Sequence, residues 1–191
     1  MADLLWLDLE YSNRDASKSR IMEVAAIATD WDFEELDSFE AVISLSEEEL
    51  KVLDEPLVDY SSGREKVIGK VRQLHEETGL LDRMAESSIT EEQAGEMLLD
   101  FISKNFTKAP ILAGNSIHWD RKMILSRWPK VEKELHYRML DITSYKLLFN
   151  QHAIRYEKDK AHRAMDDIKE SIAELKFYLD KVDLPSVNNE S

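Results

Sequence analysis

Apolar residues gather in short continuous runs at several places along the chain, and these runs predict β-strands. Residues 4–9 and 21–29 are compact runs, as expected for strands buried in a sheet. A polar segment links them, and residues 30–37 are expected to form the turn before a third strand. The complete set of expected strands is 4–9, 21–29, 38–44, 110–114 and 139–142.

Apolar residues with helical spacing predict the helices. Thr90 followed by Gln93 is a capping box, and one apolar stripe follows it, which indicates that a helix begins there. Gly79 and Pro129 are each expected to end a helix. The expected helices are 46–53, 64–77, a segment from 90 onward, 117–128 and 164–182.

The order of these elements predicts an α/β fold. Strands come first and helices then alternate with strands, which is typical of a mixed sheet flanked by helices. A chain of 191 residues with 43% hydrophobic content can bury one core. We therefore expect a single domain over residues 1–183 and a frayed tail over 184–191.

Composition restricts the environment and the chemistry. No run approaches the roughly 18 apolar residues of a membrane span, and the first ten residues contain no Lys or Arg to begin a targeting peptide, so a cytoplasmic protein is expected. The absence of cysteine excludes disulfides, thiolate nucleophiles and Cys-based zinc sites. Any metal must then be held by oxygen or imidazole.

The charge balance disfavours one class of partner. The chain has 25 basic and 39 acidic residues and a net charge of −14, whereas affinity for a long polyanion comes mainly from phosphate neutralisation. Long duplex DNA is therefore not an expected partner. A short substrate in a locally basic or metal-filled pocket stays open, although the acidity alone is more simply explained by solubility.

Two carboxylates end the first predicted strand. Asp8 and Glu10 are two residues apart, so in a strand they project from the same face. Paired oxygen ligands suit Mg²⁺ or Mn²⁺. The same spacing recurs at Asp32 and Glu34, where polar neighbours indicate an ordinary turn. Only the first pair interrupts an apolar strand, where charges are costly unless paired or metal-bound.

Two further segments offer candidate functional residues. Asp120 follows a Gly-Asn-Ser turn and falls in the first turn of a helix, where an acid also interacts favourably with the helix dipole without any catalytic role. In the last helix, helical periodicity places Asp167 on the flank of the apolar face and Asp166 nearly opposite it. His162 has a pKa suited to a general base, but a histidine at a helix start is more often exposed or capping.

Taken in order, these residues resemble the active-site signature of the DEDDh exonucleases: Asp-x-Glu on the first strand, an Asp after Gly-Asn-Ser, and His-x4-Asp near the end. Within that superfamily the chain resembles the oligoribonuclease family over nearly its whole length. The segments that carry the likeness are Trp6-Leu7-Asp8-Leu9-Glu10, Arg20-Ile21-Met22-Glu23-Val24-Ala25, Gly114-Asn115-Ser116-Ile117 with Asp120-Arg121, His136-Tyr137-Arg138 with Leu140-Asp141, and Ala164-Met165-Asp166-Asp167-Ile168 with Glu170-Ser171.

The resemblance implies a ribonuclease-H-like exonuclease fold with a central mixed five-stranded sheet. It also implies a homodimer that uses two divalent metals, Mg²⁺ or Mn²⁺, to hydrolyse short single-stranded RNA from the 3′ end to nucleoside 5′-monophosphates. The implied residue roles are metal ligation by Asp8, Glu10, Asp120 and Asp167, proton abstraction from water by His162, substrate contact by Ser116, and binding of the 5′ phosphate at the partner subunit's site by Tyr137 and Arg138.

The chain departs from the family pattern where substrate bases bind. Oligoribonucleases usually continue the Asp-Leu-Glu with Met-Thr-Gly-Leu, whereas this chain has Tyr11-Ser12-Asn13-Arg14. Pro56 or a neighbour replaces the family's base-stacking Trp, and Tyr60 or Ser61 stands before Ser62-Gly63 where the family has a His. Tyr11 or Tyr60 is expected to stack on a base instead.

Two other functions remain open from the sequence. The same chemistry on single-stranded DNA or longer RNA 3′ ends is one, and the acidic surface counts against it. The other is a non-hydrolytic nucleotide-binding module on the same fold, which the changed base-binding residues favour. Clustered carboxylates count against that module, because they are electrostatically costly without a metal.

Overall fold

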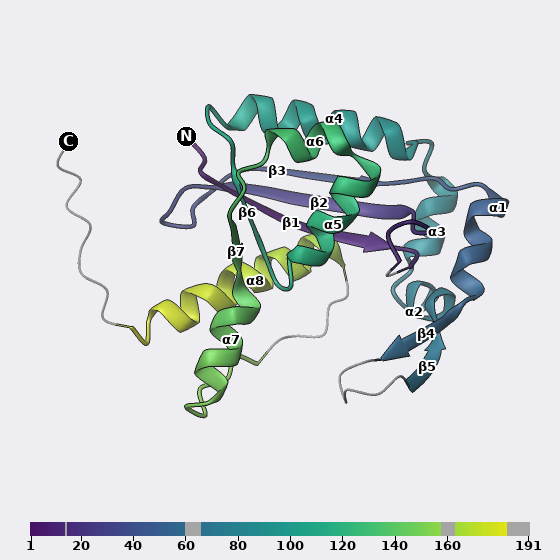
Figure 1. Cartoon of the computed structure of the whole chain (residues 1–191). Helices are drawn as coiled ribbons and strands as arrows, with labels where there is room; N and C mark the ends of the chain where they lie inside the picture. The colour runs from purple at the N-terminus through teal and green to yellow at the C-terminus, as the bar shows by residue number, and fades with distance from the viewer. Residues whose placement is uncertain (14, 60–65, 158–162, 183–191) are drawn as a thin grey trace.

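A computed structural model describes residues 1–13, 15–59, 66–157 and 163–182 of the chain, and at its centre lies a five-stranded sheet in the order β3-β2-β1-β6-β7 (Figure 1). β1 pairs antiparallel with β2 and parallel with β6, so the sheet is mixed as predicted. The strands are β1 (Leu4–Tyr11), β2 (Ile21–Thr29), β3 (Glu35–Val42), β6 (Ile111–Gly114) and β7 (Met139–Asp141).

The two faces of the sheet are covered by different helices because successive strand residues point in opposite directions. On β1, Leu5, Leu7 and Leu9 pack in the core beneath α4 (Glu91–Asn105), α5 (His118–Arg127) and α6 (Pro129–Glu134). Leu4 and Trp6 pack on the other face, against α7 (Ile142–Asn150) and α8 (Ala164–Leu179). Figure 1 shows α4 above the sheet and α8 below it. Asp8 and Glu10 continue the register of Leu4 and Trp6 and therefore face α8.

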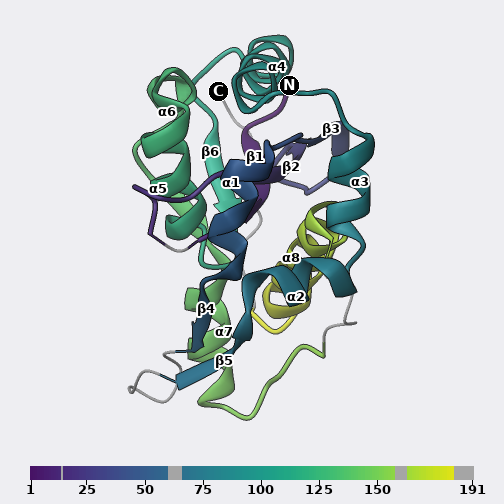
Figure 2. The ribbon, with the colours of Figure 1, turned by 90° about the vertical axis from the view of Figure 1, so that its right-hand side faces the viewer.

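The helix expected at 64–77 is correct only in its second half. Lys66–Lys70 forms β5, which pairs antiparallel with β4 (Pro56–Asp59) in a separate two-stranded sheet, and α2 (Val71–Glu77) follows. Figure 2 shows this hairpin away from the central sheet. The β-branched Val67 and Ile68 favour an extended backbone, and Gly69 is a poor helix former.

The remaining elements differ from the prediction mainly at their ends. β3 begins at Glu35, three residues early, because the pairing continues past a bulge opposite Thr29. Pro129 ends α5 but also starts α6, where proline's missing N–H costs nothing. Residues 46–53 divide into α1 (Glu47–Leu50) and the 3₁₀ turn η1 (Lys51–Asp54), while α3 (Leu80–Glu86) and α7 were not expected. The tail at 184–191 lies outside the described residues.

No helix within the described ranges combines the length and the apolar character needed to cross a membrane.

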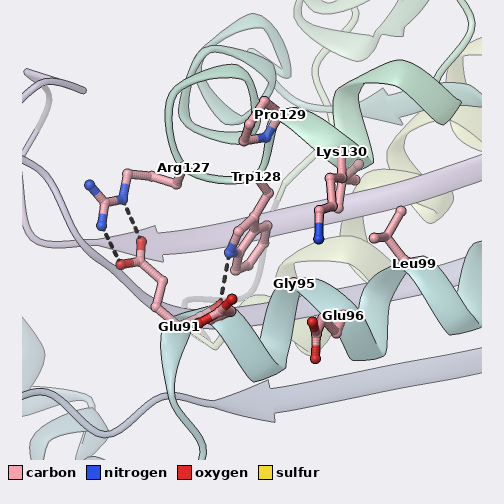
Figure 3. Close-up of a pocket in the computed structure, with 10 residues that line it drawn as sticks. Glu91, Gly95, Glu96, Leu99, Arg127, Trp128, Pro129 and Lys130 are labelled. Carbon is pink, nitrogen blue, oxygen red and sulfur yellow. Dashed lines mark hydrogen bonds and ion pairs between the residues drawn. The ribbon is translucent and has the colours of Figure 1, made fainter.

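A hollow of about 310 Å³ lies between α4 and α6, on the face of the sheet opposite α8 (Figure 3). Trp128 forms one wall and donates from Nε1 to the carbonyl oxygen of Glu91 at 2.9 Å. Arg127 beside it pairs with the Glu91 carboxylate. Gly95 lies directly under the indole, and a Cβ at this position would lie 2.7 Å from Trp128 Cδ1. Close packing of α4 on this wall therefore requires glycine.

The substitution Gly95→Ala tests this contact, because the expected change in the free energy of unfolding is opposite in sign to the usual effect of replacing glycine by alanine in a helix. In an open helix interior the change stabilises by up to about 1 kcal/mol, whereas forcing a methyl group against a packed ring costs about 1–3 kcal/mol. We expect a lower free energy of unfolding, measured by urea titration. The control is Glu96→Ala at the exposed neighbouring position, whose free energy of unfolding should stay within about 0.5 kcal/mol of the parent value. Stabilisation by Gly95→Ala would contradict close packing of Trp128 on Gly95.

Candidate metal and active site

Three carboxylates meet at the end of β1. Oxygens of Asp8, Glu10 and Asp167 all lie within 4.8 Å of one another. Asp8 and Glu10 project from one face of the strand, and α8 packs on that face through Ala164, three residues before Asp167, and Ile168, which directly follows it. The apolar face of α8 therefore brings Asp167 to the strand pair, as its predicted position on the flank of that face requires.

Asp120 approaches the same strand from α5, on the opposite face of the sheet. Its Oδ1 accepts a hydrogen bond from the backbone N–H of Leu9 at 3.0 Å, and the residue is only 6% exposed. Burial, and then the charge of Asp8, raise the pKa of Asp120. Asp120 is not in the 4.8 Å group formed by the other three carboxylates, but it borders the same cavity.

The cavity beside these acids has a volume of about 390 Å³. The end of β1, the turn from β6 into α5, and α2 form its walls. The residues that line it are Asp8, Leu9, Glu10, Tyr11, Asn13, Val71, Leu74, His75, Asn115, Ser116, Trp119 and Asp120. Carboxylates at one end and aromatic and amide groups around them make a polar hollow of the size that binds small ligands.

Negative charge is only partly compensated at this site. Burial is the main cause that raises the pKa of Glu10 to about 8, and the charges of Asp8, Glu23 and Asp167 add to it. Glu23 lies opposite Glu10 on β2 and is 1% exposed. Both of its oxygens accept hydrogen bonds from Arg83, one of them at 3.0 Å, and the Arg83 charge lowers the pKa of Glu10 in turn.

His75 is a site residue that the sequence analysis missed. It lies on α2, is 3% exposed, and places Nδ1 3.9 Å from Glu10 Oε2, too far for a hydrogen bond. Burial lowers the pKa of His75, so its ring is neutral near pH 7. A usable signal was present, because His75 stands three residues before Thr78-Gly79, much as the family's histidine precedes Ser-Gly. Residues 60–63, which the sequence pattern assigns to that motif, lie outside the described residues.

The Gly-Asn-Ser turn is tied to α8 through Asn115. Its side-chain amide donates to Ser171 Oγ at 2.8 Å and to Glu174 Oε2 at 3.1 Å. The Ser171 hydroxyl in turn donates to the carbonyl oxygen of Asp167 at 2.8 Å, and Tyr178 donates to the fully buried Glu174. This network connects the backbone of Asp167 to the turn on the other side of the cavity.

Ser116, the next residue, has a left-handed backbone with φ of 51°, which is unfavourable for a non-glycine residue. Its N–H donates to Asp141 Oδ1 at 3.0 Å and to Thr143 Oγ1 at 2.8 Å, and its hydroxyl lies 3.1 Å from the same Thr143 oxygen. Asp141 also caps α7 by accepting from the N–H of Thr143. These hydrogen bonds hold Ser116 at the cavity wall.

Two other predicted functional residues, Tyr137 and Arg138, lie away from this cavity. Tyr137 and Arg138 precede the edge strand β7, and Tyr137 is 70% exposed. His162 and Tyr60 lie outside the described residues. Asp32 and Glu34, which repeat the Asp-x-Glu spacing, donate their N–H groups to Asp30 Oδ1 in an exposed turn, as predicted.

Comparison with known proteins identifies the family. The family model described as exonuclease matches residues 5–175. An oligoribonuclease of Francisella tularensis subsp. novicida is 39% identical over 186 residues, which cover 94% of this chain and 96% of the relative. The chain belongs to the oligoribonuclease family. An oligoribonuclease of Corynebacterium glutamicum is 37% identical over 92% of this chain and 77% of the relative. As a family member the chain is a nuclease of the hydrolase class, and its acidic cluster fits the binding of divalent metal.

Solved structures show the same fold. Exonuclease I from Methylocaldum szegediense matches 95% of this chain with a TM-score of 0.60 and 15% identity. Exonuclease I of E. coli, solved in complex with a dA16 oligonucleotide, matches 93% with a TM-score of 0.55 and 15% identity. The chain spans about two-fifths of the length of these two proteins, 41% and 40%. At this identity the likeness shows that the ribonuclease-H-like exonuclease fold is shared.

The raised pKa of Glu10 predicts how stability depends on pH and metal. Glu10 holds its proton up to about pH 8 when folded, against 4.5 when unfolded, so the metal-free protein should lose stability as pH rises through this interval. The variant Glu10→Gln lacks this loss. The pKa of His75 is shifted in the opposite direction, but His75 is present in both the parent protein and Glu10→Gln, so its contribution cancels when their stabilities are compared.

Thermal unfolding with EDTA at several pH values between about 4.5 and 8.5 measures this effect. Mn²⁺ should raise the melting temperature of the parent protein more at high than at low pH, because ligation requires the ionised carboxylate. Each 1 kcal/mol corresponds to roughly 2–4 °C for a protein of this size. Identical pH profiles for the parent and Glu10→Gln would show that Glu10 ionises normally.

Proposed function

We propose that this protein is a metal-dependent 3′→5′ exoribonuclease that hydrolyses short single-stranded RNA to nucleoside 5′-monophosphates. The observation that carries the proposal is the convergence of Asp8, Glu10 and Asp167 within 4.8 Å beside a cavity of about 390 Å³. The oligoribonuclease relatives, at 37–39% identity over most of the chain, support the reaction and the substrate class.

We infer that Asp8, Glu10, Asp120 and Asp167 hold two divalent ions, Mg²⁺ or Mn²⁺. The donor set fits these ions, since hard cations prefer carboxylate oxygens, and the pKa of the buried Glu10 rises to about 8 even though the charge of Arg83 lowers it. When bound, such a pair of ions activates a water molecule and stabilises charge on the scissile phosphate and the leaving oxygen.

The reaction also requires groups that move protons and hold the substrate. His162 is proposed to accept the proton of the attacking water, from its place five residues before Asp167 in the sequence pattern. The water oxygen bonds to phosphorus, the bond to the 3′ oxygen of the preceding nucleotide breaks, and the terminal nucleotide leaves as a 5′-monophosphate. Ser116, held at the cavity wall, is proposed to contact the substrate, and Tyr11 or Tyr60 to stack on a base.

Charge and cavity size support a short substrate. The net charge of −14 opposes binding along a long polyanion. A cavity of about 390 Å³ has the volume of a small-molecule pocket. Single-stranded DNA and longer RNA ends remain the alternative substrates for the same chemistry.

We further propose that the protein is a homodimer built on the β7 edge of the sheet. Apolar side chains on β7, α7 and the preceding loop are exposed: Tyr137 at 70%, Met139 at 39%, Leu147 at 64% and Leu148 at 61%. An exposed apolar surface along an edge strand is an unfavourable surface for a monomer. In a dimer formed there, Tyr137 and Arg138 are proposed to reach the partner subunit's site, where Arg138 binds the 5′ phosphate of the substrate.

Sedimentation and activity of a charged variant test the dimer. The double change Leu147→Asp and Leu148→Asp places charges on the proposed interface, so we expect a monomer with little activity. The control is Leu36→Asp, a leucine that is 49% exposed on β3 at the opposite edge of the sheet, and this variant should remain dimeric and active. A dimeric double variant would exclude this surface as the interface.

Hydrolysis assays test the activity and the metal ligands. With Mn²⁺ or Mg²⁺ and 5′-labelled RNA, rates should be highest for the shortest substrates and low for matching DNA. Asp167→Asn should lower kcat by more than about 100-fold, beyond the usual effect of losing a group that only supports a ligand. The adjacent Asp166→Asn is the control, because Asp166 is absent from the carboxylate cluster in the described structure.

The outcomes of this assay separate the alternatives. Binding of nucleotides without any hydrolysis in either metal would favour the nucleotide-binding module. Equal rates on all lengths, or on DNA, would refute a dedicated short-RNA site while leaving the chemistry in place.

A further inference from the structure

Arg121 directly follows Asp120 on α5 but points to a different part of the molecule. Its Nη1 donates to the carbonyl oxygens of His136 and Tyr137, at 3.0 and 3.1 Å. These two residues belong to the loop between α6 and β7, which we call the 136–138 loop. Arg121 is thus the link between the helix that carries Asp120 and the loop that carries Tyr137 and Arg138.

Glu132 on α6 fixes the orientation of the Arg121 guanidinium. Glu132 Oε1 accepts from Nε at 3.0 Å and from Nη2 at 2.8 Å. The Arg121 side chain is only 17% exposed, so these charge-assisted hydrogen bonds form with little access to water. A planar guanidinium held on one edge presents its remaining N–H groups in a fixed direction.

The 136–138 loop has few other fixed points. His136 N–H donates to the carbonyl oxygen of Pro110 at 2.9 Å, and Arg138 N–H donates to His136 Nδ1 at 3.1 Å. The His136 and Tyr137 rings are 4.6 Å apart, and the Arg138 guanidinium lies 5.1 Å from the Tyr137 ring. The Tyr137 ring is exposed beyond this stack, so the backbone anchors decide where Tyr137 and Arg138 are presented.

We propose that Arg121 is a positioning residue for the active site of the partner subunit. It acts through the backbone of the 136–138 loop, and so fixes where Tyr137 and Arg138 meet the substrate bound by the other protomer. α5 then serves two sites, its own through Asp120 and the partner's through Arg121. This inference rests on the proposed homodimer with Tyr137 and Arg138 contributed in trans.

Substrate dependence gives the first test. Arg121→Lys keeps the charge but loses the fork that binds Glu132 and both carbonyls. We expect kcat/KM for a 5′-phosphorylated RNA dinucleotide to fall roughly ten- to hundredfold, as for small misplacements of binding groups, mainly through KM. The 5′-hydroxyl dinucleotide should be affected much less, because it does not use Arg138.

The matched control is Arg127→Lys. Arg127 is on the same helix and makes a similar two-point pair with Glu91, but no bond to the 136–138 loop. It should leave both substrates unaffected. Glu132→Gln is a milder second variant that keeps Arg121 but weakens its pairing. It should also lower kcat/KM more for the 5′-phosphorylated than for the 5′-hydroxyl dinucleotide, by a smaller factor. Equal loss on both substrates for both Arg121→Lys and Glu132→Gln would overturn the inference.

Mixed dimers give the decisive test. A protomer with Arg121→Lys keeps its carboxylates, while a protomer with Asp8→Asn keeps its loop. In tandem-purified heterodimers of the two, one site combines intact carboxylates with an intact partner loop, so about half of the wild-type activity should return. If Arg121 supported its own site through Asp120, no activity would return.

A parallel heterodimer of Tyr137→Ala with Asp8→Asn separates this inference from the proposed dimer. Recovery in this pair but not in the Arg121→Lys pair would overturn the role of Arg121 and leave the dimer standing. Failure of both pairs would overturn the contribution of the loop in trans, and the role of Arg121 with it. Recovery in both supports the proposal.

Discussion

Concentrated negative charge at the end of β1 is the constraint to which the surrounding structure responds. Asp8, Glu10, Glu23 and Asp120 all lie at or across this strand end, and burial makes their mutual repulsion stronger than it would be in water. Arg83 compensates Glu23, yet the pKa of Glu10 still rises to about 8. Apolar packing on both faces of the sheet holds the acids in place against this repulsion. A bound cation would reduce the repulsion.

Hydrogen-bond networks around the cavity fix the positions of the elements that carry these acids. Asn115 connects the Gly-Asn-Ser turn to Ser171 and Glu174, and Ser171 bonds to the carbonyl oxygen of Asp167. Asp141 holds the strained backbone of Ser116 and caps α7 at once. These side chains thus join the carboxylates on one side of the cavity to the turn on the other. Among them, only Asn115 itself lines the described part of the cavity.

The parts of the fold and site that could be read from sequence are those set by local periodicity. Alternation along β1 predicted that Asp8 and Glu10 share a face, and the helical stripe of α8 correctly placed Asp167 toward the site. Residues 64–77 were ambiguous, because the spacing of Val67 and Val71 suits a helix while β-branched residues and Gly69 suit the observed strand. The placement of His75 beside Glu10 and the burial of Asp120 depend on packing between distant segments, which no local pattern records.

The negative charge at the site also bears on why the proposed substrate site would need a second subunit. Within the described residues, the cavity wall of one protomer carries carboxylates, a neutral histidine and aromatic or amide groups, and no arginine or lysine. A substrate phosphate approaching it meets repulsion from a protein of net charge −14. In the proposed arrangement, metal supplies positive charge at the scissile end and Arg138 of the partner supplies it at the other. Because Arg138 sits on a loop anchored by Arg121, substrate binding would depend on how firmly one subunit holds the backbone that the other subunit uses.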